Sequence, residues 1–176
     1  MLTSQRIIDA INQQIGNEFS AMLQYTAIAA FFDGETLPEL AAFFKRQAEE
    51  EKEHAHRFIK YVLDTGAKVV IPAVAAPVNH FNFAEEAVRL SLEQEKKVTQ
   101  QVNHLVQIAK EENDYLTDTF LQWFVTEQLE EVASMQDLLR VVQRAGEANL
   151  LRVEEYLARK YGSKGSGGFA AEEDDD

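Results

Sequence analysis

The feature that most constrains the fold is a set of four long segments, each with an apolar stripe that repeats at alternating steps of three and four residues. The segments cover about residues 4–32, 37–64, 82–111 and 115–145, and each contains 28 to 31 residues. This spacing is typical of one helix face turned toward a core. Four such helices of similar length predict an all-α fold built as a four-helix bundle.

Polar side chains interrupt each stripe near its midpoint. They are Glu18 in the first segment, Glu51 and His54 in the second, Glu95 in the third, and Gln128 and Glu131 in the fourth. In a bundle of antiparallel helices these midpoints lie at one level. Burying four carboxylates together costs several kcal/mol per ion unless something compensates the charge.

Cations are the compensation that the sequence indicates. The basic residues Lys45, Arg46 and Lys52 lie off the stripe of the second segment. A Glu-x-x-His pair on an inward helix face is how helix bundles present a metal pair. Oxygen ligands with a single imidazole suit iron or manganese, and zinc could compete for the same groups.

The remaining segments predict the connections. Residues 67–81 hold an apolar, β-branched core but have no strand partner, so we expect a long extended connection across the surface of the bundle between the second and third helices. Thr3 or Ser4 is expected to cap the first helix and Thr36 the second, whereas Gly34, Gly66 and Gly146 are expected to end helices. A short fifth helix is predicted over 147–161, which gives one domain over 1–161. The Gly- and Ser-rich, then acidic, stretch 162–176 predicts a flexible acidic C-terminal tail.

Composition excludes several classes of function. The absence of cysteine rules out disulfides, thiolate metal sites and cysteine nucleophiles, and the net charge of −13 argues against a nucleic-acid partner. No apolar run approaches membrane-spanning length, and the N-terminus lacks the apolar region of a signal peptide. A cytoplasmic location is therefore expected, or an organelle if a transit peptide was removed.

Four motifs carry a resemblance to a known family. They are Asn-Glu-Phe-Ser-Ala-Met-Leu-Gln-Tyr at 17–25, Glu-Glu-Lys-Glu-His-Ala at 50–55, Glu-Lys-Lys-Val-Thr-Gln at 95–100 and Phe-Leu-Gln-Trp-Phe-Val-Thr-Glu-Gln at 120–128. Over about 160 residues the chain resembles non-haem ferritins of the ferroxidase kind, H-type and bacterial-like. The resemblance implies a homo-oligomeric shell of 24 subunits that stores ferric mineral. It also implies ferroxidase activity, in which Fe(II) is oxidised by O2.

The resemblance also implies which residues bind iron. Two irons per subunit would be held by Glu18, Glu51, His54, Glu95 and Glu131, with Glu51 bridging, and Gln128 is counted among the metal-binding residues beside them. A third iron site would use Glu50, Glu127 and Glu130. Bacterioferritins carry a second Glu-x-x-His on the fourth helix, where this chain has Gln128-x-x-Glu131, so no haem is expected.

Several roles stay open at the level of the sequence. Tyr25 could donate a hydrogen bond to a ligand carboxylate, donate an electron, or serve as an ordinary core residue. Trp123 could relay charge, although we expect a buried packing role. Leu121 replaces a carboxylate that the family places near the pore for Fe(II), which points to a differently lined route. Asp118, Asp114 or Gln122 could contribute to that route.

Competing functions share much of this pattern. A storage shell whose metal centre is slow or stably occupied would use the same ligands and mainly nucleate mineral. A rubrerythrin-like peroxidase is disfavoured by the absence of cysteine and by the fifth helix. A purely structural bundle would be stabilised, without loss of activity, when Glu95 or Glu131 is replaced by leucine.

Overall fold

The protein is described here by a computed structural model that covers residues 2–162 of the 176-residue chain. In that range it contains α1 (Gln5–Gly34), α2 (Pro38–Asp64), α3 (Ala84–Glu111), α4 (Tyr115–Ala145), the 3-10 helix η1 (Glu147–Asn149) and α5 (Leu150–Tyr161). The predicted all-α fold is confirmed. None of these helices combines the length and apolarity needed to cross a membrane. Residues 163–176, nearly all of the predicted tail, lie outside the described residues.

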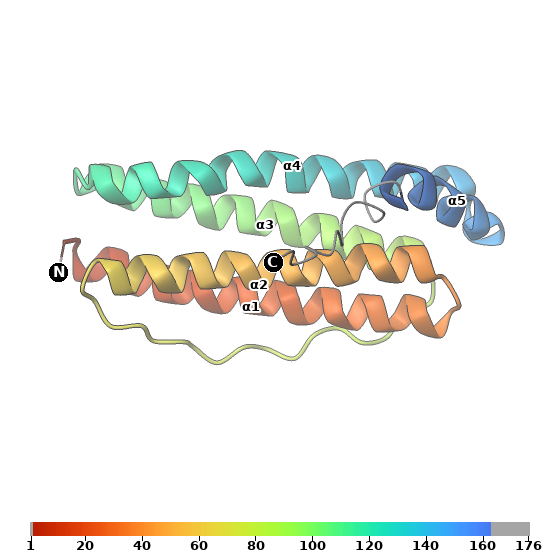
Figure 1. Ribbon diagram of the computed structural model, residues 1–176, viewed down its shortest axis with the longest axis horizontal. Helices are drawn as coiled ribbons and strands as arrows, with labels where there is room; N and C mark the ends of the chain where they lie inside the picture. Colours follow the sequence, from red (N-terminus) through yellow and green to blue (C-terminus); the bar gives the residue numbers. More distant parts are fainter. Residues whose placement is uncertain (1, 163–176) are drawn as a thin grey trace, which may run out of the picture.

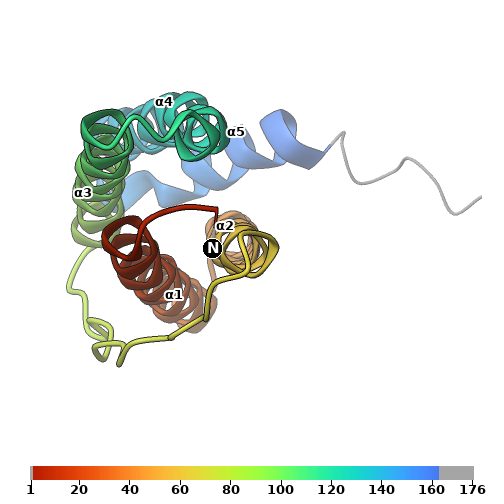
Figure 2. The same cartoon turned by 90° about the vertical axis from the view of Figure 1, so that its left-hand side faces the viewer.

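The four long helices form two antiparallel pairs. α1 packs along α2, α3 packs along α4, and all four follow the long axis of the molecule (Figure 1). Seen from one end, the helices occupy the four corners of a bundle (Figure 2). The helix α5 lies at the end of the bundle away from the N-terminus and contacts α2 and α4.

The connection between α2 and α3 runs the length of the bundle in an extended form, as predicted (Figure 1). Two amide side chains of α1 hold its backbone. Asn12 donates to the Lys68 carbonyl (3.3 Å) and accepts from the Val70 N–H (3.0 Å). Gln24 exchanges two hydrogen bonds of 2.9 Å with the backbone of Val78. The connection therefore brings α3 back to the end of the bundle where α2 begins.

Most helix ends lie where the sequence predicts them. Ser4 caps α1 by accepting from the Ile7 N–H at 3.2 Å, and Gly66 and Gly146 adopt φ of 76° and 70° after α2 and α4. α3 begins two residues later than predicted.

The prediction that Thr36 caps α2 is wrong, whereas α1 does end at Gly34. Gly34 is the last residue of α1, and Thr36 adopts φ 60° instead of capping α2. Leu37 takes the cap position without a side-chain hydrogen bond. Its φ/ψ of −115°/73° lies outside the α region, which the following proline disfavours, and the left-handed position of the turn falls on Thr36, before the Leu37-Pro38 pair.

The core divides into two apolar clusters with a polar layer between them. One cluster gathers side chains from residues 21–32 of α1, 37–48 at the start of α2, 84–92 of α3 and 135–142 of α4. The other gathers residues 7–15, 58–62, 98–109 and 121–124. On every long helix the predicted polar positions fall in the gap between these ranges. Met22, which lies four residues after Glu18 and so on the predicted inward stripe of α1, is only half-buried.

Candidate metal centre

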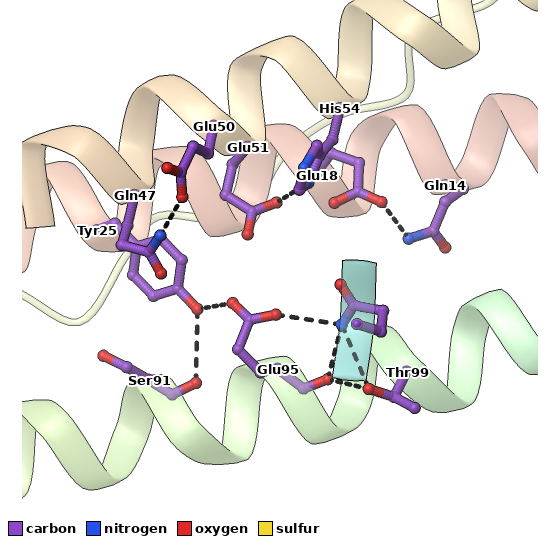
Figure 3. Close-up of polar contacts among 11 residues, drawn as sticks. Gln14, Glu18, Tyr25, Gln47, Glu50, Glu51, His54, Ser91, Glu95 and Thr99 are labelled. Carbon is purple, nitrogen blue, oxygen red and sulfur yellow. Dashed lines mark hydrogen bonds and ion pairs between the residues drawn. The ribbon is translucent and has the colours of Figure 1, made fainter. Parts of the chain in front are cut away.

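All six polar side chains that interrupt the stripes are buried in the layer between the two apolar clusters. Their exposed fractions are 0% for Glu18 and Glu95, 1% for Glu51, 3% for Gln128, 4% for His54 and 5% for Glu131. Glu18 comes from α1, Glu51 and His54 from α2, and Glu95 from α3 (Figure 3). The prediction that these positions face inward at one level is confirmed.

Glu18, Glu51 and His54 form the tightest group. One ligand atom from each lies within 4.8 Å of the others, and His54 Nδ1 is 3.3 Å from Glu51 Oε2. Two carboxylate oxygens and one imidazole nitrogen in this arrangement bracket a position that a divalent cation can occupy.

Glu18 has one oxygen held and one left free. Gln14, one turn earlier on α1, donates its Nε2–H to Glu18 Oε1 at 2.7 Å, and Asn17 donates to Gln14 Oε1 at 3.0 Å, which orients the Gln14 amide. Glu18 Oε2 is buried and forms no hydrogen bond among the described residues. A buried carboxylate oxygen without a donor is costly, and a cation would satisfy it. Sequence reasoning missed Gln14, although its i, i+4 spacing from Glu18 was the available signal.

Glu95 is held by hydrogen bonds on both carboxylate oxygens (Figure 3). The Tyr25 hydroxyl donates to Oε1. Gln128 donates its Nε2–H to Oε2 and to the Glu95 carbonyl, both at 3.2 Å. Of the roles considered for Tyr25, hydrogen bonding to a carboxylate of the site is the one the geometry provides. Gln128, expected beside the metal ligands, contacts Glu95 through its amide nitrogen.

The residues predicted for a third iron site line one pocket. This pocket has a volume of about 270 Å³, and its lining includes Gln47, Glu50, Glu127, Glu130 and Glu131. Glu131 is therefore common to the buried layer and to the pocket.

Comparison with known proteins identifies the family of this chain. Residues 8–145 match the ferritin family, described as a ferritin-like domain. The chain belongs to the ferritin family. This match lies inside the predicted domain of residues 1–161 and covers the four helices that build the site. Ferritins bind and store iron in hollow multi-subunit shells.

Similar ferritins come from several organisms. The chain is 44% identical over 156 residues to ferritin BfrB of Mycolicibacterium smegmatis, covering 89% of this chain and 86% of the relative. It is 36% identical over 146 residues to a bacterial non-heme ferritin of Staphylococcus aureus, covering 83% and 88%. A solved structure, an open pore ferritin from Archaeoglobus fulgidus, has a TM-score of 0.86 at 31% identity and covers 89% of this chain and 97% of its own.

Burial sets the electrostatics of the ferritin site. It is the largest cause of a pKa of about 7 for Glu18 and about 9 for Glu131, and the neighbouring carboxylate of Glu95 contributes to both increases. Burial likewise raises the pKa of Glu51 and of Glu95. Without a cation, these shifts favour protonated carboxyl groups over buried negative charges. Cations that bind there displace those protons.

His54 is kept neutral by its surroundings. Burial and, to a smaller extent, the positive charge of Arg57 lower the pKa of His54 to about 4. A neutral imidazole has a free lone pair at pH 7, which a metal ligand requires. The electrostatics therefore fit a metal centre, since the imidazole is unprotonated and the carboxylates are short of positive partners.

Trp123 corrects one expectation. Trp123, expected to be buried, is 37% exposed. Its ring lies 3.9 Å from the Arg57 guanidinium and 5.5 Å from the His54 ring. Leu121 is 0% exposed and belongs to the apolar cluster at its end of the bundle, and a differently lined route for Fe(II) stays a prediction. Asp118 accepts a hydrogen bond from Gln122 at 2.9 Å.

Proposed function

We propose that this ferritin oxidises Fe(II) with O2 at the buried layer and stores the ferric product in a shell. The observation that supports this proposal most strongly is the state of Glu18 Oε2. It is a buried oxygen without a hydrogen-bond donor, on a carboxylate grouped with Glu51 and the neutral imidazole of His54. An apolar or purely structural core gains nothing from such an oxygen, whereas a cation site needs it.

Five side chains receive roles in this proposal. Glu18 and His54 bind the first Fe(II), Glu95 and Glu131 bind the second, and Glu51 bridges the two ions. Carboxylate oxygens favour the harder Fe(III), which lowers the reduction potential and makes oxidation downhill. Two Fe(II) ions supply the two electrons that reduce O2, with two protons, to hydrogen peroxide.

The neighbouring residues support the pair. Tyr25 and Gln128 hold Glu95 by hydrogen bonds and keep it oriented, as partners of ligating carboxylates do. Glu50, Glu127 and Glu130 supply a third iron site in the pocket next to Glu131. No haem takes part. A role for Tyr25 or Trp123 in electron transfer remains a prediction.

Membership of the ferritin family supports a proposal for the assembly. We propose a homo-oligomer of 24 subunits with two irons per subunit at the pair. Its partners are Fe(II) and O2, and neither nucleic acid nor a membrane is one. A cytoplasmic location remains the expectation.

Stopped-flow absorbance tests the oxidation step. Apoprotein is mixed aerobically with two Fe(II) per chain, for the unsubstituted protein, Glu51→Ala and the matched control Glu53→Ala, whose carboxylate is exposed on the same helix. We expect a fast ferric absorbance rise in the unsubstituted protein and in Glu53→Ala, and loss of the fast phase in Glu51→Ala.

Slow rises that are equal in the unsubstituted protein and Glu51→Ala would contradict the proposal.

A second addition of two Fe(II) per chain to the unsubstituted protein separates turnover from stable occupancy. A repeated fast phase indicates turnover. A single fast phase favours the alternative, a shell whose centre fills once and mainly nucleates mineral.

A further inference from the structure

Two arginines of α2 lie beside the acidic pocket without pairing with its carboxylates. Arg46 is the basic residue in the lining of this pocket, together with four glutamates. Arg57 lies eleven residues further along α2, which is about three helical turns, and so it occupies the same face of the helix. Within residues 2–162 neither guanidinium forms an ion pair.

The missing ion pairs have partners at the right spacing. Glu50 follows Arg46 by four residues, and Glu53 precedes Arg57 by four, the spacing at which charged side chains on one helix meet. Glu50 instead accepts a hydrogen bond from Gln47 (Figure 3). Several other helical pairs three or four residues apart do form ion pairs: Lys60–Asp64, Arg89–Glu85 and Lys96–Glu93.

Each of the two guanidinium groups lies over an aromatic ring from another helix. Arg46 is 4.9 Å from the centre of the Tyr161 ring of α5, and Arg57 is 3.9 Å from the centre of the Trp123 ring of α4. Each ring packs against a buried phenylalanine, with ring centres 5.8 Å apart for Tyr161 and 4.9 Å apart for Trp123. A cation–π contact at an exposed site is about as strong as an exposed ion pair, so a fixed ring can hold an arginine against a nearby carboxylate.

Both arginines are close enough to act on the pocket. Burial and the charge of Glu127 raise the pKa of Glu50, and the charge of Arg46 opposes that increase. Burial and the charge of Glu130 raise the pKa of Glu127, and Arg57 opposes that increase. A guanidinium that paired with one of these carboxylates would occupy the oxygens that a cation needs and would repel the cation.

We propose that Tyr161 and Trp123 are positioning residues that hold Arg46 and Arg57 on their rings and so keep the pocket carboxylates free of internal ion pairs. Through Tyr161, α5 then affects the charge of a pocket whose carboxylates come from α2 and α4. The proposal rests on the proposed function for the use of the pocket as a third iron site. It gives Trp123 a role that needs an aromatic ring and no electron transfer.

Crystal structures of metal-free variants test where the arginines lie. In Tyr161→Leu we expect Arg46 to pair with Glu50, and in Trp123→Leu we expect Arg57 to pair with a pocket carboxylate. Tyr161→Phe and Trp123→Phe keep a ring at each place and are the matched controls, in which both arginines should stay where they are. Arginines that form no ion pair with the pocket in either leucine variant would overturn the proposal.

Mn(II) binding tests what the arginines do to the pocket. Anomalous diffraction from crystals soaked at increasing Mn(II) concentrations separates ions in the pocket from ions in the buried layer. We expect Tyr161→Leu to weaken binding in the pocket by about two- to fivefold, the strength of an exposed cation–π contact, and Tyr161→Phe to leave it unchanged. In an Arg46→Gln background, Tyr161→Leu should have no effect on this binding.

This comparison separates a role through Arg46 from a loss of packing by α5. Equal weakening by Tyr161→Leu with and without Arg46 would mean that the ring acts through packing alone, and it would overturn the proposal. Absence of Mn(II) from the pocket of the unsubstituted protein would contradict the third iron site instead. The metal-free structures decide the positions of the arginines in either case, and they are independent of the Fe(II) oxidation test.

Discussion

At the scale of single residues, Glu131 makes the stability of the apoprotein depend on pH. Its pKa rises from 4.5 to about 9 on folding, chiefly through burial. Between these values the folded chain holds a proton that the unfolded chain has lost, so the free energy of unfolding falls as pH rises. At 1.36 kcal/mol per unit, we expect a loss of about 2 to 3 kcal/mol between pH 5 and 7 relative to Glu131→Gln. Denaturant unfolding of both metal-free proteins measures the difference.

The same experiment has an internal control. Saturating divalent metal takes the place of the proton on Glu131, so the difference in pH dependence between the two proteins should change when metal is added. Parallel pH profiles for the metal-free proteins would show that Glu131 is ionised in the folded apoprotein, contrary to what burial predicts.

Residue positions were predictable where they follow helix periodicity. The stripes placed Glu18, Glu95 and Glu131 inward because the register of a long helix fixes which face each residue occupies. Trp123 was not predictable in this way. It follows Gln122 and precedes the buried Phe124, at the edge of the inward face, and periodicity does not tell how far neighbouring elements cover an edge.

At the scale of elements, Gly16 determines how closely the long connection approaches α1. A Cβ added to Gly16 would lie 2.3 Å from Pro72 Cγ, and the proline ring cannot rotate away. Gly→Ala in a helix interior gains about 1 kcal/mol of propensity, but overpacking costs about 1 to 3 kcal/mol. We expect Gly16→Ala to be destabilising overall, with faster amide exchange at Val70 and Val78, whose N–H groups bond to α1. Gly34→Ala meets no atom within 4 Å and serves as the control that should not destabilise.

The sequence predicted the connection as extended but not what holds it. Asn12 and Gln24 lie on the outer part of α1, where amides are usually solvated, and their partners are backbone groups that no residue pattern marks. Contacts to backbone depend on the path of the chain, so they become visible only in three dimensions.

At the scale of the whole molecule, the similar lengths of the four long helices make the level of the site predictable from the sequence. Each long helix places its polar residues near its midpoint, so antiparallel packing brings them to one level between two apolar clusters. What holds the end of the bundle was not readable. There, Glu154 accepts hydrogen bonds from backbone N–H groups in the first turn of α2, and Glu147 accepts them from the first turn of α3. The two helices belong to different pairs.

These carboxylates give the last prediction. Glu154 of α5 accepts hydrogen bonds from the backbone N–H groups of Glu39 (2.8 Å) and Leu40 (2.9 Å) at the start of α2, where Leu37 provides no side-chain cap. A carboxylate at this place satisfies free N–H groups and favours the helix dipole. We expect Glu154→Ala to destabilise the protein by about 1 to 2 kcal/mol and to speed amide exchange at Glu39 and Leu40. Glu155→Ala, which removes an exposed carboxylate from the same helix, should change neither. Unchanged exchange at Glu39 and Leu40 in Glu154→Ala would mean that α5 does not hold the start of α2.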